Sequence, residues 1–163
     1  LPSLRLHQVE PLEVEGMIAS SSRIRELIAA GAVCEAGALL GRPYFIRGSV
    51  AHGDGRGKGL GFATANLELS SSLTPGRGIY AVEAEQGGRR YPAVANLGFR
   101  PTFGGRTFST EIHLLDFEDD LYGEQMTVHF MGRIRDEMRF ESVEQLKLRI
   151  AQDVTAARGI LEQ

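Results

Sequence analysis

The chain has 163 residues, 42% of them hydrophobic, so it can bury one full core but is short for two complete domains. Its 18 Lys and Arg residues and 21 Asp and Glu residues give a formal net charge of -3, which argues against a nucleic-acid-binding surface because such a surface is basic. With one cysteine, Cys34, an internal disulfide is excluded, and the lack of a run of about 18 apolar residues argues against a membrane span.

The same features favour a reducing, cytoplasmic setting. A lone cysteine is typical of a protein from a reducing compartment. The four histidines, His7, His52, His113 and His129, include no close pair at zinc-ligand spacing. No basic-then-apolar leader opens the chain, which begins at Leu1 rather than Met, so we expect a cytoplasmic chain cut from a longer protein.

The first forty residues differ in pattern from the rest. A short extended stretch leads to the serines at 20–22, which supply an N-cap for a predicted helix, and Gly31 suits the position where the chain leaves that helix. A second short helix is predicted over 33–40. Residues 41–43, Gly-Arg-Pro, then break the pattern, and we place a domain boundary there, between 1–40 and 41–163.

From residue 44 onward the pattern is that of β-strands. Short runs in which Val and Ile alternate with polar residues are separated by glycine-rich turns, as expected for strands with one buried face. These runs span 45–50, 79–85, 90–96, 108–115 and 126–133. Five or six such strands without helix-length connections predict a small antiparallel barrel rather than a parallel sheet.

The end of the chain changes to a helical period. Apolar residues recur every three or four positions, which places them along one stripe of a long helix. They are Val143, Leu146, Ile150, Val154, Ala157 and Leu161. Ser142 is expected to cap this helix while Gln145 reaches back, as in a capping box. We interpret the stripe as core packing against the barrel.

The chain has 20 glycines, and six of them crowd into residues 48–61, with Arg56 and Lys58 among them. Glycine lets backbone N–H groups converge on an anion without hindrance from a Cβ atom, so this segment can wrap phosphates. It has neither the Gly-Lys-Ser or Gly-Lys-Thr of a P-loop nor the surrounding βαβ unit of a dinucleotide fold. Taken alone, a flexible hairpin connection is the more ordinary explanation, and the two basic side chains favour an anion.

Thr64 and Asn66 follow two positions apart, so in an extended strand their side chains share a face. Both offer a neutral oxygen, which suits a magnesium ion that keeps its waters and its substrate phosphates. The alternative is a solvated strand face, and the glycines directly upstream favour the ligand role.

Glu111 shares a predicted strand face with Ser109 and His113, whereas Ile112 and Leu114 point the other way. A carboxylate there is suited to take a proton from an attacking hydroxyl, provided that it lies within hydrogen-bond reach. The ordinary alternatives are a solvent-exposed glutamate and a histidine bonded to neighbouring backbone.

Two further segments are unusual. Residues 96–105 hold Arg100 and two aromatic residues, and we predict a long loop rather than a simple hairpin. Residues 132–140 join the last strand to the helix and alternate charges with Met138 and Phe140. That alternation suits a planar, hydrogen-bonding ligand, and it equally suits a charged linker with two core anchors.

Together these segments resemble the riboflavin kinase family, specifically the C-terminal module of bacterial bifunctional riboflavin kinase/FMN adenylyltransferase. The matching blocks, in order, are 48–67, 75–80, 94–103, 111–123 and 135–140 with the following helix. The resemblance implies a mainly β fold, a six-stranded antiparallel Greek-key barrel with a long C-terminal α-helix, preceded by a short strand and two short helices. It also implies transfer of the γ-phosphate of ATP to the 5′-hydroxyl of riboflavin, with Mg²⁺, giving FMN and ADP.

The resemblance assigns roles residue by residue. Glu111 would be the catalytic base, and Thr64 and Asn66 would serve magnesium. The ATP-binding residues would be Gly48, Val50, His52, Gly53, Arg56, Gly57, Lys58, Gly61 and Thr64. The flavin-binding residues would be Asn96, Arg100, Arg135, Asp136, Met138 and Phe140. The family's proline is Ala63 here, which loses rigidity but keeps both oxygen ligands, so we expect retained activity with a looser metal site.

Residues 1–40 resemble the end of the adenylyltransferase domain. Residues 21–25, Ser-Ser-Arg-Ile-Arg, are similar to its Ser-Ser-Thr-x-Ile-Arg signature. The His-x-Gly-His nucleotide site of that domain is absent from this sequence, so we do not expect FAD synthesis by this chain alone. The expected partners are small-molecule substrates and the missing domain, with no nucleic acid and no membrane.

Three alternative functions share these features. A non-catalytic barrel that binds flavin or nucleotide would need the glycines but not Glu111 opposite a metal site. A nucleic-acid-binding barrel is disfavoured by the acidic balance of charge. A metal-free phosphate sensor would bind its ligand equally well in the presence of a chelator.

Overall fold

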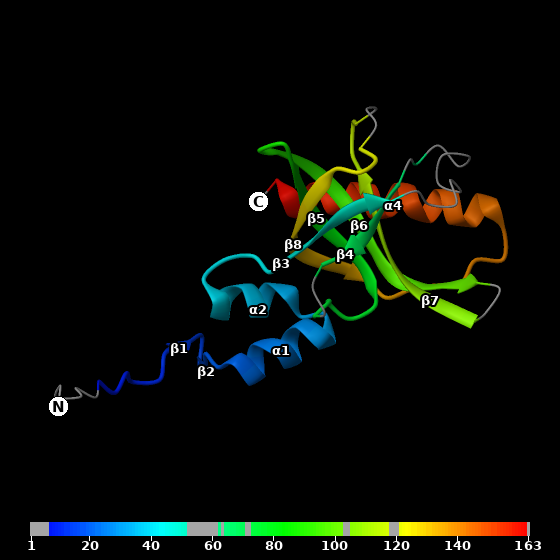
Figure 1. Cartoon of the computed structure of the whole chain (residues 1–163). Coiled ribbons are helices and arrows are strands. Elements are labelled where there is room, and N and C mark those ends of the chain that lie inside the picture. The colour runs from blue at the N-terminus through cyan, green and yellow to red at the C-terminus, as the bar shows by residue number, and fades with distance from the viewer. Residues whose placement is uncertain are drawn as a thin grey trace.

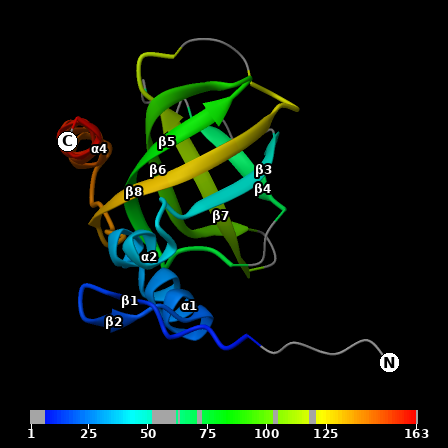
Figure 2. The same ribbon diagram turned by 90° about the vertical axis from the view of Figure 1, so that its left-hand side faces the viewer.

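The computed structural model describes residues 7–51, 62, 64–70, 73–102, 105–117 and 121–162, with the backbone alone at 100–102, 105 and 106. Its main body is a β-barrel with a long helix lying against the outer wall (Figure 1). The two short N-terminal helices lie together at one end of the barrel (Figure 2). None of the helices in the described ranges is long and apolar enough to cross a membrane.

The barrel is closed and antiparallel. Its strands are β3 (Phe45–Ala51), β4 (Ala65–Leu69), β5 (Gly78–Gln86), β6 (Arg89–Thr102), β7 (Gly105–Leu114) and β8 (Gln125–Arg135). They are paired in the order β3-β4-β7-β6-β5-β8, and β8 pairs back to β3. The helices are α1 (Ser21–Ala30), α2 (Val33–Leu40) and α4 (Val143–Leu161), and a small hairpin, β1 (Glu13–Val14) and β2 (Met17–Ile18), precedes them. The predicted six-stranded barrel, the two short helices and the long C-terminal helix are confirmed.

The short helices begin and end where their capping residues predict. The Ser20 hydroxyl accepts a hydrogen bond from the Arg23 N–H at 3.2 Å, which caps α1. Gly31 after α1 and Gly41 after α2 have φ angles of 79° and 67°, a left-handed conformation that glycine adopts without a steric cost. Leu27, Ile28, Ala36 and Leu39 bury one another between the two helices, and Tyr44 of the barrel side packs on them. The domain division at residue 41 stays a prediction.

The barrel interior is filled by the apolar residues that alternate along each strand. Tyr80 and Phe130 are the largest fully buried side chains there, and their rings meet edge to face with centroids 5.3 Å apart. Ile112 and Leu114 point into this core, as the alternation on β7 predicts. The neighbouring polar residues of the same strands therefore lie on the outer wall.

The hairpin between β6 and β7 differs from the sequence prediction. Residues 96–105 are not a long loop, because the two strands stay paired from Leu97 opposite Thr110 as far as Thr102 opposite Gly105. Phe99 and Phe108 are directly opposite, with ring centroids 5.6 Å apart, and such a cross-strand aromatic pair stabilises a two-stranded arm. Of the two aromatic residues that made the segment look irregular, Phe99 thus belongs to a cross-strand pair, and Phe103 lies outside the described residues.

Helix α4 packs on the outer faces of β5, β6 and β8. Its C-terminal half confirms the predicted stripe, since Val154, Ala157 and Leu161 pack against Ile79, Ala81, Val94 and Leu115 of the barrel side. Its N-terminal half does not, because Leu146 and Ile150 line a cavity and Val143 is 51% exposed. The first turns of the helix therefore form the roof of a cavity, and only the later turns pack directly on the barrel.

The start of α4 has the predicted Ser142 cap, and Gln145 reaches back as predicted, but to the residue before the cap rather than to Ser142 itself. The Ser142 hydroxyl accepts from the Gln145 N–H at 3.2 Å, and the Gln145 side-chain oxygen accepts from the Glu141 N–H at 3.3 Å.

We expect Ser142→Ala to lower the free energy of unfolding by about 1 kcal/mol, because the cap satisfies an otherwise unpaired N–H at the helix start. Urea unfolding monitored by circular dichroism measures this change. Thr155→Ala is the matched control on the same helix, since its hydroxyl only bonds the Ala151 carbonyl at 3.0 Å and alanine is the better helix former. Equal stability of the Ser142→Ala variant and the wild type would contradict the capping role.

Candidate functional site

A row of side chains crosses the outer wall of the barrel. Asn66 on β4 is directly opposite Glu111 on β7, and Glu111 is directly opposite Asn96 on β6. The row continues from Asn96 to Ile79 on β5 and from Ile79 to Arg135 on β8. Because directly opposite residues of an antiparallel sheet point to the same face, these five side chains lie side by side on the wall.

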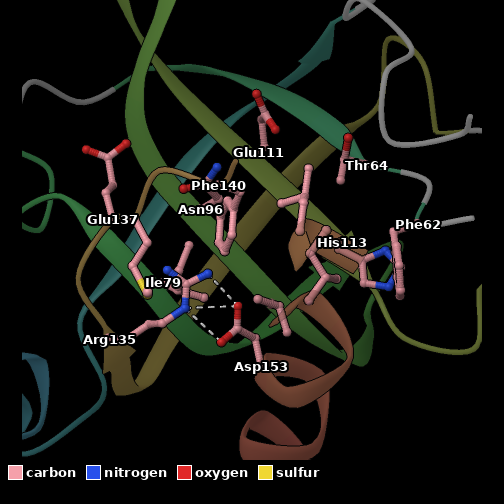
Figure 3. A pocket seen from close by; sticks show the side chains of 14 residues that line it. Phe62, Thr64, Ile79, Asn96, Glu111, His113, Arg135, Glu137, Phe140 and Asp153 are labelled. Atoms are coloured by element: carbon pink, nitrogen blue, oxygen red, sulfur yellow. Dashed lines mark hydrogen bonds and ion pairs between the residues drawn. The ribbon is translucent and has the colours of Figure 1, made fainter. Parts of the chain in front are cut away.

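A cavity of about 290 Å³ lies over this row, between the barrel wall and α4. Figure 3 shows Thr64 and Glu111 together at one end of it and Arg135 with Asp153 at the other. Its lining residues are Phe62, Thr64, Ile79, Val94, Asn96, Glu111, His113, Arg135, Glu137, Met138, Phe140, Leu146, Ile150 and Asp153. The cavity is thus formed by strands, by the first turns of α4 and by the segment between β8 and α4.

The two sides of the cavity differ in chemistry. Aliphatic and aromatic side chains from β5, β6, α4 and the segment before α4 make one side, suited to a flat apolar ligand; they are Ile79, Val94, Met138, Phe140, Leu146 and Ile150. A hydroxyl, a carboxylate and an amide make the other side, at Thr64, Glu111 and Asn96. His113 lies beside them, with its ring edge to face with that of Phe62 at 5.5 Å. The arrangement accommodates an apolar ring with a polar extension.

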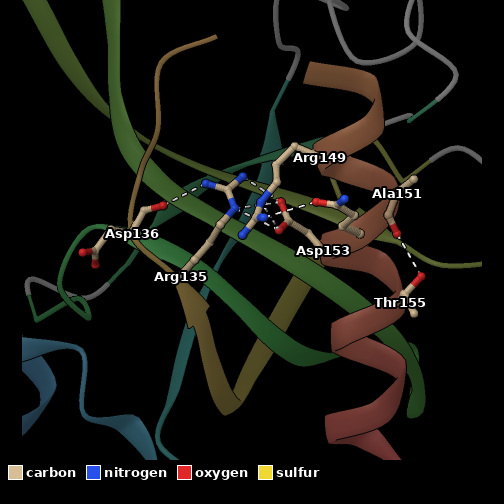
Figure 4. A network of polar contacts seen from close by, with 7 residues as sticks. Arg135, Asp136, Arg149, Ala151, Asp153 and Thr155 are labelled. Atoms are coloured by element: carbon tan, nitrogen blue, oxygen red, sulfur yellow. Dashed lines mark hydrogen bonds and ion pairs between the residues drawn. The ribbon is translucent and has the colours of Figure 1, made fainter. Parts of the chain in front are cut away.

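A buried ion pair joins α4 to the end of β8 (Figure 4). The Arg135 guanidinium donates to both carboxylate oxygens of Asp153, from Nε at 2.9 Å and from Nη2 at 2.7 Å. Its third nitrogen, Nη1, donates to the Asp136 carbonyl at 2.8 Å. The two side chains are 11% and 4% exposed, and Arg149 adds a second positive charge, with its Nε 3.4 Å from Asp153 Oδ1.

The ion pair gives Arg135 a structural role in addition to the flavin contact predicted for it. The sequence prediction places this residue on the flavin, but its three guanidinium nitrogens all donate to protein oxygens. Its charge also lies over the Phe140 ring, 5.8 Å from the centroid. Arg135 lines the cavity, and its contacts fix the positions of α4 and Phe140.

Glu137 also lines the cavity. Its carboxylate lies over Gly98 so closely that a Cβ atom there would come within 1.9 Å of Oε1. Arg77 holds the other oxygen, with Nη1 3.7 Å from Oε2. The missing side chain at Gly98 is what allows Glu137 to lie against the wall.

The structure brings together six of the residues predicted for the site. Glu111, Thr64, Asn96, Arg135, Met138 and Phe140 all line the cavity. Asn66 is outside the lining but is the direct cross-strand neighbour of Glu111 on the same face. Asp136 is not in the cavity, because its side chain is 84% exposed and its carboxylate pairs with Arg133 at 2.7 Å. A side-chain contact of Asp136 with a flavin is therefore not supported.

Most of the predicted ATP-binding residues fall on the glycine-rich segment. His52, Gly53, Arg56, Gly57, Lys58 and Gly61 lie outside the described residues, as do Ala63 and the side chain of Arg100. Gly48 lies in β3 opposite Leu69. The Val50 side chain packs in the barrel core, and its N–H and carbonyl bond to Glu124 and Gly123, so a nucleotide contact through this side chain is ruled out.

Sequence reasoning missed several cavity residues: Phe62, Ile79, Val94, Glu137, Leu146, Ile150 and Asp153. Two signals were available. Phe62 directly precedes the Thr64 and Asn66 pair, and Glu137 lies inside the charged segment that ends at Phe140. The apolar residues read as ordinary core positions, and Asp153 as an ordinary polar residue of a helix, because a sequence does not show which turn of a helix covers a cavity.

Comparison with known proteins places the chain in one family. The family model described as riboflavin kinase matches residues 40–161. The chain belongs to the riboflavin kinase family. A bifunctional riboflavin kinase/FMN adenylyltransferase of Pseudomonas fluorescens is 42% identical over 152 residues, which cover 93% of this chain and 49% of the relative. The enzyme of the same description from Escherichia coli K12 is 43% identical over 144 residues, which cover 88% of this chain and 46% of the relative.

Two solved structures share the fold, and one of them is described as a riboflavin kinase. A crystal structure of a riboflavin kinase from Trypanosoma brucei superposes with a TM-score of 0.55 at 29% identity, covering 74% of this chain and 81% of that one. A chain described as a macrolide-efflux protein from Streptococcus pneumoniae superposes with a TM-score of 0.86 at 42% identity, covering 92% of this chain and 50% of that one. The chain spans about half the length of the bifunctional relatives that it matches.

We expect Asp153→Ala to lower the free energy of unfolding by about 3 kcal/mol, because it leaves the Arg135 charge largely buried without its partner. Chemical denaturation of variant and wild type measures the loss. Glu26→Ala is the control, since its pair with Arg23 is also an arginine–carboxylate contact but its side chains are 48% and 66% exposed, and we expect a loss below about 1 kcal/mol. Similar losses in the two variants would show that burial adds nothing to the Arg135 pair.

Proposed function

We propose that this chain is an ATP-dependent riboflavin kinase, which transfers the γ-phosphate of ATP to the 5′-hydroxyl of riboflavin and gives FMN and ADP. One observation carries the proposal beyond family membership. Thr64 and Glu111 share the polar end of a cavity whose remaining walls are largely apolar and aromatic. A flavin has the matching shape, a flat ring system with a hydroxylated chain that ends in the reacting alcohol.

The flavin ring is assigned to the apolar side of the cavity. Phe140 and Met138 from the segment before α4 face Ile79 and Val94 of the barrel wall across the space. The hydroxylated chain would then run along the row of Asn96 and Glu111 toward Thr64. In this pose Asn96 is the amide best placed to hydrogen-bond a hydroxyl or a ring edge, because it lies directly opposite Glu111 on the neighbouring strand.

Nucleotide phosphates are assigned to the glycine-rich segment. The described residues at its two ends support this, because Ala51 of β3 is directly opposite Asn66 of β4, so the segment leaves and returns at one edge of the barrel. Its returning end passes through Phe62 and Thr64, which line the cavity. The segment therefore begins and ends beside Glu111, where a phosphate would have to meet the alcohol.

Glu111 is the proposed general base. Its carboxylate accepts the proton of the riboflavin 5′-hydroxyl as that oxygen forms a bond to the γ-phosphorus and the bond from phosphorus to the β,γ-bridging oxygen breaks, so that ADP leaves. Arg56 and Lys58 are proposed to hold the phosphates. Positioning of the two substrates supplies most of the rate, because phosphoryl transfer requires little covalent participation of the protein.

Magnesium is proposed as the metal. The donor set fits it, since Thr64 and Asn66 offer neutral oxygens beside the Glu111 carboxylate, and Mg²⁺ prefers oxygen ligands while it keeps water and phosphate oxygens in its shell. When bound, the ion supplies neutralisation of the negative charge on the phosphates. Thr64 and Asn66 would hold it at the end of the cavity nearest the glycine-rich segment.

The relatives carry a second activity in their name, FMN adenylyltransferase. We propose that a longer protein containing this chain would carry out both reactions, and that residues 1–163 alone do not synthesise FAD. A cytoplasmic location, as favoured by the single cysteine, belongs to the same proposal. The non-catalytic binding barrel is not favoured, since it gives no reason for Glu111 to lie beside Thr64.

The direct test is to incubate the chain with ATP, riboflavin and Mg²⁺ and to look for FMN and ADP by chromatography. Glu111→Gln is expected to lower kcat by about 100-fold to 10,000-fold, the usual contribution of a general base, while binding of the nucleotide changes little. Glu68→Gln is the matched control, because Glu68 is an exposed glutamate on β4, next to β7. Undiminished turnover by the Glu111→Gln variant would refute the base.

We expect Thr64→Ala to raise the Mg²⁺ concentration needed for half-maximal activity about tenfold, since it removes one oxygen ligand. Magnesium titrations at fixed ATP and riboflavin concentrations measure the change. Thr64→Ser, which keeps the hydroxyl, is expected to stay near the wild type. An unchanged magnesium dependence of the alanine variant would count against Thr64 as a ligand.

A further inference from the structure

Three segments far apart in the sequence meet at the C-terminal end of α1. The Arg133 side chain of β8 joins them: Nη1 donates to the Ala30 carbonyl at 3.0 Å, and Nη2 donates to the Arg77 carbonyl at 2.7 Å. Nη2 also donates to the Asp136 carboxylate at 2.7 Å. We call this set of contacts, made by Ala30, Gly31, Gly76, Arg77, Arg133 and Asp136, the α1 joint.

The α1 joint is packed so closely that glycine is required at two of its positions. A Cβ atom at Gly31 would come within 2.5 Å of the Tyr80 hydroxyl oxygen and 3.0 Å of Arg133 Nη1. A Cβ atom at Gly76 would come within 2.5 Å of the Ala29 carbonyl oxygen, and the Gly76 N–H donates to the Ile28 carbonyl at 3.0 Å. The end of α1 is therefore in direct backbone contact with the turn that precedes β5.

Tyr80 ties the α1 joint to the barrel core. Its ring is fully buried in the barrel, and its hydroxyl donates to the Gly76 carbonyl. Burial raises the pKa of Tyr80, although the Arg133 charge opposes the shift, so the hydroxyl keeps its proton for this bond.

The α1 joint continues into the wall of the cavity. Asp136 directly precedes Glu137 and Met138, which line the cavity. Arg133 holds the Asp136 carboxylate from the α1 side, while Arg135 holds the Asp136 carbonyl from the α4 side. Arg133 binds the carbonyl of Arg77, and the side chain of the same residue reaches Glu137, with Arg77 Nη1 3.7 Å from Glu137 Oε2. Residues 136–138 are thus anchored from two sides, and one of the two anchors depends on α1.

We propose that Arg133 is a positioning residue for flavin binding, which uses the end of α1 to fix residues 136–138 against the cavity. Helix α1 lies before residue 40, where the match to the riboflavin kinase family model begins. The upstream segment is then a component of the flavin site rather than a passive remnant of another domain. This inference rests on the proposed function for the identity of the ligand.

Two C-cap glycines provide a matched pair of variants. Gly31→Ala places a methyl group against Tyr80 and Arg133 and moves the end of α1 away without changing any kinase side chain. Gly41→Ala imposes the same left-handed strain on α2, with φ of 67° against 79°, but its methyl group meets nothing within 4 Å. A difference between the two variants therefore reports the α1 joint and not the strain of an alanine in a left-handed conformation.

Arg133→Lys tests the same contact from the barrel side. Lysine keeps the charge but its single nitrogen does not reach three oxygens in fixed directions as a guanidinium does. Arg90→Lys is its control, since the hydrogen bonds of the Arg90 guanidinium to described residues go to Glu83 and Glu85, away from α1. This pair keeps the test decisive if Gly31→Ala fails to fold.

We expect Gly31→Ala and Arg133→Lys each to raise the KM for riboflavin about tenfold, while kcat and the KM for ATP stay within about twofold of the wild type. Gly41→Ala and Arg90→Lys are expected to match the wild type in all three constants. A general loss of structure would instead lower kcat and raise the KM values for riboflavin and ATP together. Equal riboflavin KM values in Gly31→Ala and Gly41→Ala, or in Arg133→Lys and Arg90→Lys, would overturn the proposal.

A second measurement separates this inference from the proposed function. The methyl resonance of Met138 in a chain labelled with ¹³C-methyl methionine reports residues 136–138 without turnover. We expect it to shift in Gly31→Ala and in Arg133→Lys and to stay in place in Gly41→Ala, even if the wild-type chain forms no FMN, a result that would refute the function alone. An unshifted Met138 methyl in both α1-joint variants would refute the positioning role.

Discussion

The pairing register of β4, β7 and β6 fixes the proposed base, Glu111, between Asn66 and Asn96. Asn66, Glu111 and Asn96 are neighbours on one face because each is directly opposite the next. A slip of one residue would turn Glu111 into the apolar interior and Ile112 out to the wall. Closure of the barrel opposes such a slip, because each strand is paired on both sides and none is free to move along a single partner.

The barrel wall forms one side of the cavity, and α4 with the segment before it forms the other. The position of that second side depends on directional hydrogen bonds. Apolar packing of α4 on the barrel tolerates small shifts of the helix, whereas the two-oxygen contact of Arg135 with Asp153 sets one position. Burying this pair costs desolvation free energy, which well-aligned contacts must offset. The additional hydrogen bond from Arg135 to the Asp136 carbonyl helps to offset it. Arg133 holds the same short segment from the side of α1. Two neighbouring arginines of β8 thereby connect both helical elements to one wall of the cavity.

Local signals were sufficient for much of the fold. Ser20 and Gly31 predicted the limits of α1, Ser142 and Gln145 predicted the start of α4, and the alternation on β7 predicted that Glu111 faces away from the core. The long loop expected at 96–105 was wrong, because residues 97–102 continue β6 and pair with β7, where Phe99 meets Phe108 across the hairpin. The flavin contact expected of the Asp136 side chain stays a prediction, since its carboxylate pairs with Arg133 and Asp136 does not line the cavity.

The sequence by itself determined which residues alternate, where helices begin and end, and which family the motif order resembles, because each of these depends on near neighbours in the chain. Only the tertiary structure decided that Asp153 pairs with Arg135, that Leu146 and Ile150 line a cavity, and that the end of α1 contacts Arg133. These relations join residues that are distant along the chain. Their geometry follows from how the closed barrel, α4 and α1 pack together, which no local pattern of residues encodes.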